Sequence, residues 1–251
     1  MSEILNLTML SFLTYEMKLK LLPKFALSLG VLGAILTVAI SVFSYQSSKW
    51  YLEDMYAQRI ISGSKSVATL LDKDDIKAIL SPGGEKSEAY KRVENMLNEI
   101  KRDSNVTYLS LVIPDEDSVT FYIDSCVEEM GDDPEGKLAY GTDILYTDAA
   151  NGKEDLQKYY QIWELYLQNK GTEEPLVTDN SYGYNYTAVA PILDENGKAI
   201  AEIQYILDMQ SVRNHLNSFL RDMLMISLVI ISAALLIYML GMEKIVINPV
   251  K

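Results

Sequence analysis

Two uncharged apolar segments, one near each end of the chain, constrain the fold more than any other feature. Residues 25–43 read FALSLGVLGAILTVAISVF and residues 223–242 read MLMISLVIISAALLIYMLGM. At a rise of 1.5 Å per residue, about 20 apolar residues in a helix cross a hydrocarbon core of about 30 Å. Core helices of soluble proteins are usually amphipathic, with a polar stripe. We therefore predict two transmembrane helices, at 25–45 and 223–242, over the alternatives of core helices or a cleaved leader.

The first apolar segment does not resemble a cleavable signal peptide. It is longer than the apolar region of about 7–15 residues that such peptides carry, and no small-x-small cleavage site follows it. Instead, the chain continues from Tyr45 to Trp50 directly into a helical pattern. We expect an uncleaved membrane anchor.

The charges that flank the two segments predict the topology. Lys18, Lys20 and Lys24 precede the first segment, and Lys244 and Lys251 follow the second. Because cytoplasmic flanks are enriched in Lys and Arg, residues 1–24 and 243–251 are predicted to be cytoplasmic and residues 46–222 extracytoplasmic. The chain is thus expected to be a two-pass protein of the cell membrane.

Charge and composition exclude several function classes. The chain has 22 Lys and Arg against 35 Asp and Glu, and residues 46–222 hold 17 and 32 of these, a net charge of −15. So acidic a surface repels phosphates, which argues against a nucleic-acid partner. Cys126 and His215 are the only residues of their kinds, so an intrachain disulfide and cysteine metal clusters are excluded and a Ser/His/Asp triad is disfavoured. We predict no cofactor, no metal site and no catalytic residue, and interpret the acidic loop at 128–135 as solvated rather than calcium-binding because it lacks the alternation of an EF-hand.

Between the two spans, the periodicity of apolar residues changes from helical to strand-like and back. A long helix is expected to rise from the membrane to about Leu71, because apolar residues recur at steps of three and four. The later elements are helices at 88–101, 153–167 and 210–221, hairpins at 106–124 and 182–208, a short strand at 176–177 and an irregular stretch at 126–147. This order predicts an α+β fold: a PAS-like antiparallel sheet with a long N-terminal helix, flanked by two transmembrane helices.

Alternation along the strands separates two faces of the predicted sheet. The apolar face is expected to pack on the long helix and comprises Leu109, Leu111, Ile113, Phe121, Ile123, Ala201, Ile203, Tyr205 and Leu207. The opposite face is rich in hydroxyl groups and comprises Tyr108, Ser110, Thr120, Tyr122, Asp124, Tyr182, Tyr184, Tyr186, Gln204 and Asp208. A solvated face usually carries Lys, Glu and Thr, so these tyrosines suggest a covered, semi-polar cleft.

The cleft is the candidate binding site. Its predicted ligand-binding residues are Tyr122, Asp124, Tyr182, Tyr184, Tyr186 and Asp208, with Tyr160 and Trp163 as a lid. Aromatic rings and carboxylates favour a cationic or zwitterionic ligand. Two alternatives remain: the tyrosines are ordinary strand residues, and Asp208 only caps the helix that follows it.

Several stretches resemble a known family of receptors. Residues 179–192, the turn Asp194-Glu195-Asn196-Gly197 and the strand ending at Asp208 are similar to the closing hairpin of extracytoplasmic Cache sensor domains, and residues 121–125 resemble the second sheet strand of a single Cache domain. Residues 243–250, EKIVINPV, are similar to the opening of a HAMP linker. The resemblance implies a ligand sensor, but the Arg/Trp/Asp pattern by which double Cache receptors recognise amino acids is absent from the sequence.

Three functions are compatible with this reading. The first is the input module of a transmembrane signal-transduction receptor, which binds a small polar ligand (an amine, an amino acid or an organic acid) and acts as a homodimer on a cytoplasmic output domain. The second is a bitopic membrane scaffold whose outer domain binds another protein. The third is a membrane-anchored hydrolase. It is disfavoured because one histidine and one cysteine supply neither a nucleophile–base pair nor a metal cluster, which leaves only carboxylate chemistry open to it.

Overall fold

The computed structural model describes residues 2–180 and 182–242, so the HAMP-like stretch at 243–250 lies outside the described residues. The chain divides into two compact units. The globular unit is residues 51–213, and the helical unit combines residues 1–50 with 214–251.

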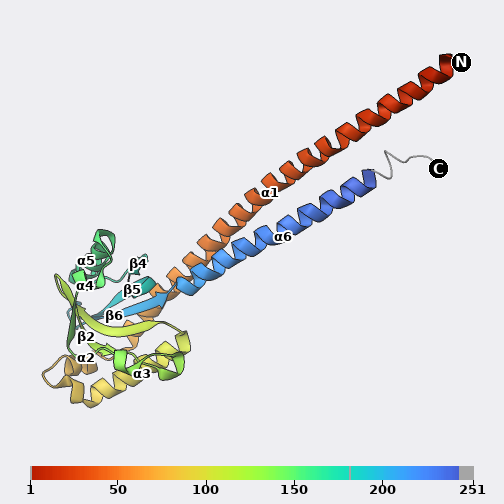
Figure 1. The fold of residues 1–251 in the computed structure, drawn as a ribbon. Coiled ribbons are helices and arrows are strands. Elements are labelled where there is room, and N and C mark those ends of the chain that lie inside the picture. Colours follow the sequence, from red (N-terminus) through yellow and green to blue (C-terminus); the bar gives the residue numbers. More distant parts are fainter. Residues whose placement is uncertain (1, 181, 243–251) are drawn as a thin grey trace. The chain divides into compact units, whose positions relative to one another are not determined.

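Helices and strands follow one another along the chain in a mixed order (Figure 1). They are α1 (Ser2–Leu70), α2 (Lys73–Ile79), α3 (Glu88–Ser104), β1 (Tyr108–Pro114), β2 (Ser118–Asp124), β3 (Thr142–Leu145), α4 (Tyr146–Ala149), α5 (Lys153–Leu167), β4 (Leu176–Asn180), β5 (Gly183–Leu193), β6 (Ala199–Asp208) and α6 (Gln210–Met242). Local chemistry sets several of these bounds. The Ser87 hydroxyl accepts a hydrogen bond from the Tyr90 amide at the start of α3, and Asn105 ends that helix in the left-handed region.

Six antiparallel strands form one sheet in the order β3-β2-β1-β6-β5-β4. Two hairpins make up most of it: β1 with β2, and β5 with β6. The second hairpin turns at Asp194–Gly197, where Gly197 has a φ of 77°, a conformation that glycine adopts at no steric cost. Since β6 pairs with both β1 and β5, it lies in the middle of the sheet.

A bulge in β2 changes which side chains share a face. Leu111 pairs with Ile123 and Val112 pairs with Phe121, so Tyr122 has no partner opposite it on β1. An extra residue in one strand reverses the alternation beyond it. As a consequence, Ile123 packs into the main core whereas Phe121 lies on the other face of the sheet.

The main core lies between one face of the sheet and the first three helices. Its largest fully buried side chains include Ile60 of α1, Ile76 and Ile79 of α2, Leu97 of α3, and Leu109, Leu111 and Ile203 of the sheet. Helix α1 approaches the sheet closely at Gly63, where an added Cβ would lie 2.9 Å from the Tyr205 ring. The predicted packing of the apolar sheet face on the long helix is confirmed for β1 and β6.

The other face of the sheet carries α4 and α5. Val112 and Val119 pack with Tyr146 of α4, and Val189 and Leu176 pack with Ile162 of α5. The sheet is therefore covered on both faces, by α1–α3 on one and by α4 and α5 on the other. The candidate site lies on the face of the sheet that α4 and α5 cover.

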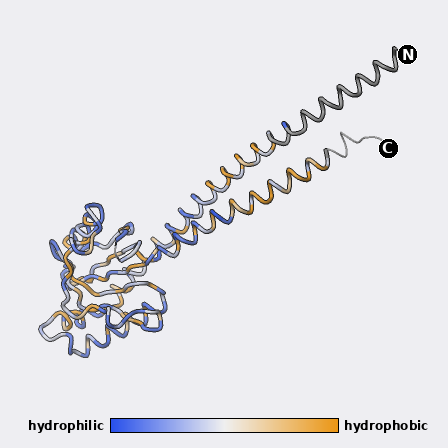
Figure 2. The backbone as a smooth tube through the Cα atoms, viewed as in Figure 1, coloured by the Kyte–Doolittle hydropathy of each residue, from blue (hydrophilic) through white to orange (hydrophobic). Residues whose placement is uncertain are grey.

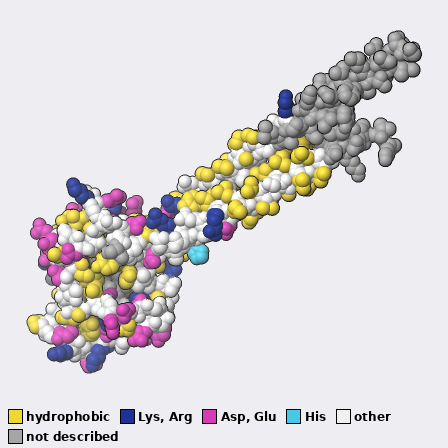
Figure 3. Space-filling view, in the orientation of Figure 1, with side chains coloured by type: hydrophobic (Ala, Val, Ile, Leu, Met, Phe, Trp, Pro, Cys, Tyr) yellow, Lys and Arg dark blue, Asp and Glu magenta, His cyan; other side chains and the backbone are white. Residues whose placement is uncertain are grey.

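Two helices that run through the helical unit are long and apolar enough to cross a membrane, at Ser28–Leu70 and Gln210–Gly241. Of their most apolar 18-residue windows, 6% and 0% are buried. Figure 2 shows hydrophobic residues along both helices, and Figure 3 shows apolar side chains on the visible surface of both. Within this unit the helices pack at small residues: a Cβ added at Gly30 would lie 3.1 Å from the Leu235 side chain. Tyr45 Oη also donates to Asn217 Oδ1 over 3.4 Å.

The predicted fold class, α+β with a PAS-like antiparallel sheet and a long N-terminal helix, is confirmed. The helix expected to end near Leu71 ends at Leu70, and the helix expected at 153–167 is α5. One expectation is wrong: residues 126–147 are not irregular throughout, because Thr142–Leu145 pairs with β2 as the edge strand β3. Thr142–Leu145 forms a strand because its backbone pairs with β2. Four residues are too few for the alternation of polar and apolar side chains to predict such a strand.

Candidate functional site

A cavity of about 290 Å³ lies between the sheet and α5. Its volume is at the lower end of the range for small-molecule sites. The wall combines apolar, aromatic and uncharged polar side chains with one carboxylate: Tyr108, Ser110, Val119, Phe121, Asp124, Gly136, Leu138, Ile144, Ala149, Tyr159, Ile162, Thr178, Asn180, Tyr182, Asn185, Thr187, Gln204 and Ile206. Asp124 is the only charged residue among these described wall residues, so the cavity favours positive over negative charge.

The Asp124 carboxylate is held in place by two hydrogen bonds. Its Oδ1 accepts from Ser110 Oγ over 2.9 Å and its Oδ2 accepts from the Leu138 amide over 3.1 Å. The first contact crosses the β1–β2 pair and the second joins the strand to the loop that follows it. Each carboxylate oxygen has a second acceptor position, so Asp124 retains capacity for a donor from a ligand.

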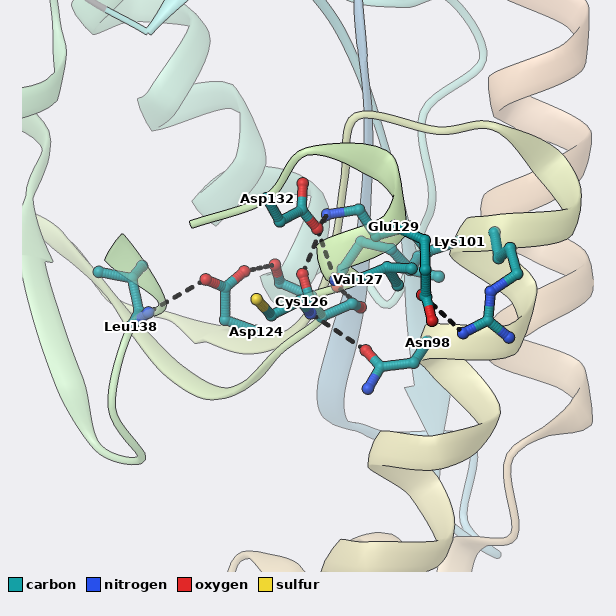
Figure 4. A network of polar contacts seen from close by, with 12 residues as sticks. Asn98, Lys101, Asp124, Cys126, Val127, Glu129, Asp132 and Leu138 are labelled. Atoms are coloured by element: carbon teal, nitrogen blue, oxygen red, sulfur yellow. Dashed lines mark hydrogen bonds and ion pairs between the residues drawn. The ribbon is translucent and has the colours of Figure 1, made fainter. Parts of the chain in front are cut away.

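Loop 125–138, which supplies Gly136 and Leu138 to the wall, is fixed by a buried network (Figure 4). The Lys101 ammonium group, whose side chain is 2% exposed, donates to the Asp132 carboxylate and to the Ser125 carbonyl. The same Asp132 oxygen accepts from the Val127 amide over 2.7 Å, and Asn98 Oδ1 accepts from the Cys126 amide over 3.1 Å. Asp132 is therefore a structural residue of the loop.

Helix α5 forms the opposite wall through Tyr159 and Ile162. The Tyr159 ring stacks on Tyr146 with a centroid distance of 5.6 Å, and its hydroxyl accepts from Asn180 Nδ2 over 3.2 Å. Burial raises the pKa of the Tyr159 hydroxyl, so this group stays neutral at physiological pH. It presents a polar edge and an aromatic face to the cavity.

On the sheet side, Asn185 has an unused polar atom. Its Nδ2 donates to the Tyr182 carbonyl over 3.0 Å, which fixes the orientation of the amide. Its buried Oδ1 has no hydrogen-bond partner within the described part of the chain. Buried acceptors are usually paired, so Asn185 is an exception that lies in the cavity wall.

The structure brings two of the predicted site residues, Asp124 and Tyr182, to the cavity. Three others, Tyr122, Tyr184 and Tyr186, pack on the opposite face with the main core. The bulge in β2 turns Tyr122 toward Tyr140, 5.3 Å away between centroids. The predicted placement of these three tyrosines in the cleft is therefore wrong.

The error on β5 has a different cause. Asn185 and Thr187 line the cavity, so Tyr184 and Tyr186, which alternate with them, point to the helices. Tyr186 is 5% exposed, and burial raises the pKa of its hydroxyl. Tyrosine can occupy a core position because its ring is apolar and its hydroxyl needs only one partner.

The remaining predicted residues lie near the cavity but outside it. Asp208 Oδ1 accepts from the Gln210 amide over 2.7 Å, so the capping role left open for Asp208 is the observed one. Tyr160 and Trp163 of α5 line a separate, wider groove of about 960 Å³ together with Asp115, Glu116, Asp117 and Glu164. The predicted lid of Tyr160 and Trp163 is therefore wrong, and Tyr159 and Ile162 are the residues of α5 that line the cavity.

Sequence reasoning missed Tyr159, Asn180, Asn185 and Thr187. Tyr159 lies on the same predicted helix as Tyr160 and Trp163. Asn185 and Thr187 alternate with Tyr184 and Tyr186 on β5, so the register of this strand identifies them as cavity residues. Within the described residues, no group of three or more His, Cys, Asp and Glu is arranged to hold a metal ion.

No family model matches the chain, and no curated protein matches its sequence. Solved structures with a similar arrangement include the Escherichia coli DcuS sensor domain, which is 14% identical with a TM-score of 0.39 over 63% of this chain and 95% of that one. The ligand-binding domain of the Campylobacter jejuni chemoreceptor Tlp3, in complex with 4-methylisoleucine, is 12% identical with a TM-score of 0.43 over 74% of this chain and 63% of that one. A double mutant of the inducer-binding domain of the PobR transcription factor from Acinetobacter, in complex with 3-hydroxybenzoic acid, is 13% identical with a TM-score of 0.33 over 53% of this chain and 94% of that one.

Proposed function

We propose that this chain is the input part of a transmembrane signal-transduction receptor of the single Cache type. It binds a small polar ligand outside the cell and passes the change through the second span to a cytoplasmic output domain, by way of the HAMP-like stretch. One observation carries the proposal: Gln204 and Ile206 of β6 line the cavity, and only Met209 separates β6 from the apolar helix α6. A ligand that contacts β6 therefore acts on the strand that leads directly into α6.

Contacts of α5 support the same route. Tyr166 Oη donates to the Ala199 carbonyl over 3.3 Å, and Asn169 Oδ1 accepts from the Ala199 amide over 2.7 Å. A ligand that shifts α5 thus also shifts the first residue of β6. Coupling of this kind is limited by the difference in ligand affinity between the two states, typically about 1–3 kcal/mol.

The charge of the wall supports a ligand with an ammonium group. Asp124 supplies the negative charge, and the rings of Tyr108, Tyr159 and Tyr182 supply aromatic faces. Carboxylate pairing and cation–π contacts each favour such a ligand. Amines and amino acids are therefore preferred over organic acids, which would face Asp124 without a counter-charge in the described wall.

Ligand binding is tested by thermal shift on the full chain in detergent, screened against amines, amino acids and organic acids. A ligand at a hundredfold excess over its Kd stabilises the folded state by about 2.7 kcal/mol. For a protein of this size the melting temperature should rise by roughly 5–10 °C. No shift with any compound, with the circular dichroism of a folded protein, would contradict the proposal.

Two matched variants locate the binding site. Asp124→Asn changes the charge of the cavity wall and should abolish the shift, whereas Asp208→Asn changes an acidic residue at the end of β6, outside the wall, and should leave the shift intact. If Asp208→Asn removed the shift and Asp124→Asn did not, the ligand would bind elsewhere.

The alternative, a membrane scaffold that binds another protein, rests on the wider groove along α5. That groove presents Tyr160 and Trp163 beside four acidic residues. Substituting Trp163 by alanine should impair a scaffold while leaving a thermal shift with small ligands unchanged, which separates the two functions. The predicted homodimer is compatible with both functions.

A further inference from the structure

A carboxyl group without a hydrogen-bond partner is buried in the middle of the sheet. The Glu202 side chain is fully buried, and neither of its oxygens has a partner among the residues that the structure describes. Glu202 pairs with Val112 of β1 on one side and with Pro191 of β5 on the other. Alternation with Ala201 and Ile203, which belong to the main core, places Glu202 on the α5 side of β6.

Glu202 is uncharged in this environment. An ionised carboxylate that is buried without a partner costs far more than a neutral one, and burial accordingly raises the pKa of Glu202 well above its ordinary value. Tyr146 of α4 and Tyr166 of α5 are two titratable groups of the covering helices that interact electrostatically with Glu202. Both are phenols whose pKa burial also raises, so neither can neutralise a Glu202 carboxylate.

Helix α5 is the element that can uncover Glu202. The strands on either side of β6 are joined to it by ladders of hydrogen bonds, and the far face of the sheet is the main core. By contrast, α5 is held to the sheet by side chains. Tyr166 and the following Asn169 bond to β6 at its end, and apolar side chains of α5 pack on the sheet in two small clusters, one around Ile162 and one around Tyr146. Separating α5 from the sheet therefore breaks side-chain contacts but no ladder of backbone hydrogen bonds between strands.

We propose that α5 is a proton-linked lid, which stays closed over the sheet while Glu202 holds its proton and opens when that proton passes to solvent. The closed form binds one proton more than the open form at every pH between the ordinary pKa of a glutamate, about 4.3, and the higher pKa of the buried group. Over this interval the ratio of closed to open lid falls tenfold per pH unit. Rising pH therefore opens the lid.

Lid opening also acts on the cavity, because Tyr159 and Ile162 of α5 form one of its walls. The proposal does not depend on the identity of a ligand, and it can be tested without one. A protein that binds no small molecule would still show the pH-dependent lid.

The test is hydrogen exchange of the full chain in lipid nanodiscs between pH 5.5 and 8.5, without ligand. The protection of α5 amides, corrected for the intrinsic rates, is compared with that of α3 in the same molecule. We expect the ratio of α5 to α3 protection to fall by up to tenfold per pH unit in the wild type. In Glu202→Gln, which has no proton to lose, the ratio should not change with pH.

Two further variants keep the outcome decisive. In Glu202→Leu the ratio of α5 to α3 protection should also not change with pH. This variant replaces Glu202→Gln if the buried amide of the glutamine prevents folding. Asp155→Asn changes a buried acid on α5 itself, whose Oδ2 accepts from the Asn151 amide, and should keep the wild-type slope. A constant ratio in the wild type, an unchanged slope in both Glu202 variants, or loss of the slope in Asp155→Asn would each overturn the proposal.

Discussion

At the scale of single residues, the buried lysine of α3 decides how one wall of the cavity is held. Lys101 follows Ile100 on an amphipathic helix, and its spacing alone does not distinguish it from its exposed neighbour Arg102. In the structure the Lys101 side chain is 2% exposed and pairs with Asp132, whereas the Arg102 side chain is 51% exposed and pairs with Glu129. Two adjacent cations therefore bind the same loop in different dielectric surroundings.

Asp132→Ala should destabilise the protein strongly, because it leaves the Lys101 ammonium group buried without its counter-charge. Breaking a buried pair in this way costs about 3–5 kcal/mol, and the partial exposure of Asp132, 23%, puts the expected cost near the lower limit. Glu129→Ala is the matched control in the same loop, since an exposed pair contributes about 0–1 kcal/mol. Thermal unfolding of the full chain checks both, and equal melting temperatures for the two variants would contradict the structural role of Asp132.

At the scale of elements, the distance between α1 and the sheet is set by a glycine. Gly63 faces Tyr205, which is 3% exposed and belongs to the main core, so the ring has no space to move away from an added Cβ. Alanine at position 63 would stabilise the helix by about 1 kcal/mol through its higher helix propensity, yet overpacking of the core would cost about 1–3 kcal/mol. The close approach therefore explains why a glycine is found in the middle of a long helix.

Gly63→Ala should lower stability by roughly 1 kcal/mol overall, since the clash with Tyr205 exceeds the gain in propensity. Ser66→Ala, on the exposed side of α1, should be neutral or slightly stabilising. Combining Gly63→Ala with Tyr205→Leu should recover part of the loss relative to Tyr205→Leu alone, because the smaller side chain leaves room for the methyl group. The melting temperatures of the four variants decide between a packing effect and a general intolerance of α1 to substitution.

The elements themselves were largely predictable from the sequence, whereas the faces of two strands were not. Helical spacing located α1, α3 and α5, and the Asn196-Gly197 pair located the second hairpin, because these signals are local. The bulge at Tyr122 and the register of Tyr184 and Tyr186 depend on strand pairing, which joins residues far apart in the chain. For this reason the cavity was expected on the correct side of the sheet, with Asp124 and Tyr182 in its wall, but with three tyrosines that belong to the core.

At the scale of the whole molecule, charge is distributed in the manner expected of a protein that crosses a membrane twice. On the face of the globular unit that Figure 3 shows, acidic side chains are spread among apolar and uncharged ones, and lysines flank the apolar segments at residues 18–24 and 244–251. The free energy of moving lysine-rich flanks across a bilayer opposes their export. The globular unit, with its net negative charge, is the part expected outside the cell.

Labelling of single cysteines tests this topology. In a Cys126→Ser background, Asn196→Cys places a thiol in the exposed turn between β5 and β6, and Lys18→Cys places one before the first apolar segment. A membrane-impermeant maleimide should label position 196 in intact cells and position 18 only after permeabilisation, because the hydrocarbon core separates the two. The Cys126 backbone amide, which donates to Asn98 Oδ1, is unaffected by the background substitution. Labelling of position 196 only in lysed cells would place the globular unit in the cytoplasm, where no extracellular ligand reaches the cavity. Labelling of both positions in intact cells would show that no membrane separates them. Either result would contradict the predicted topology.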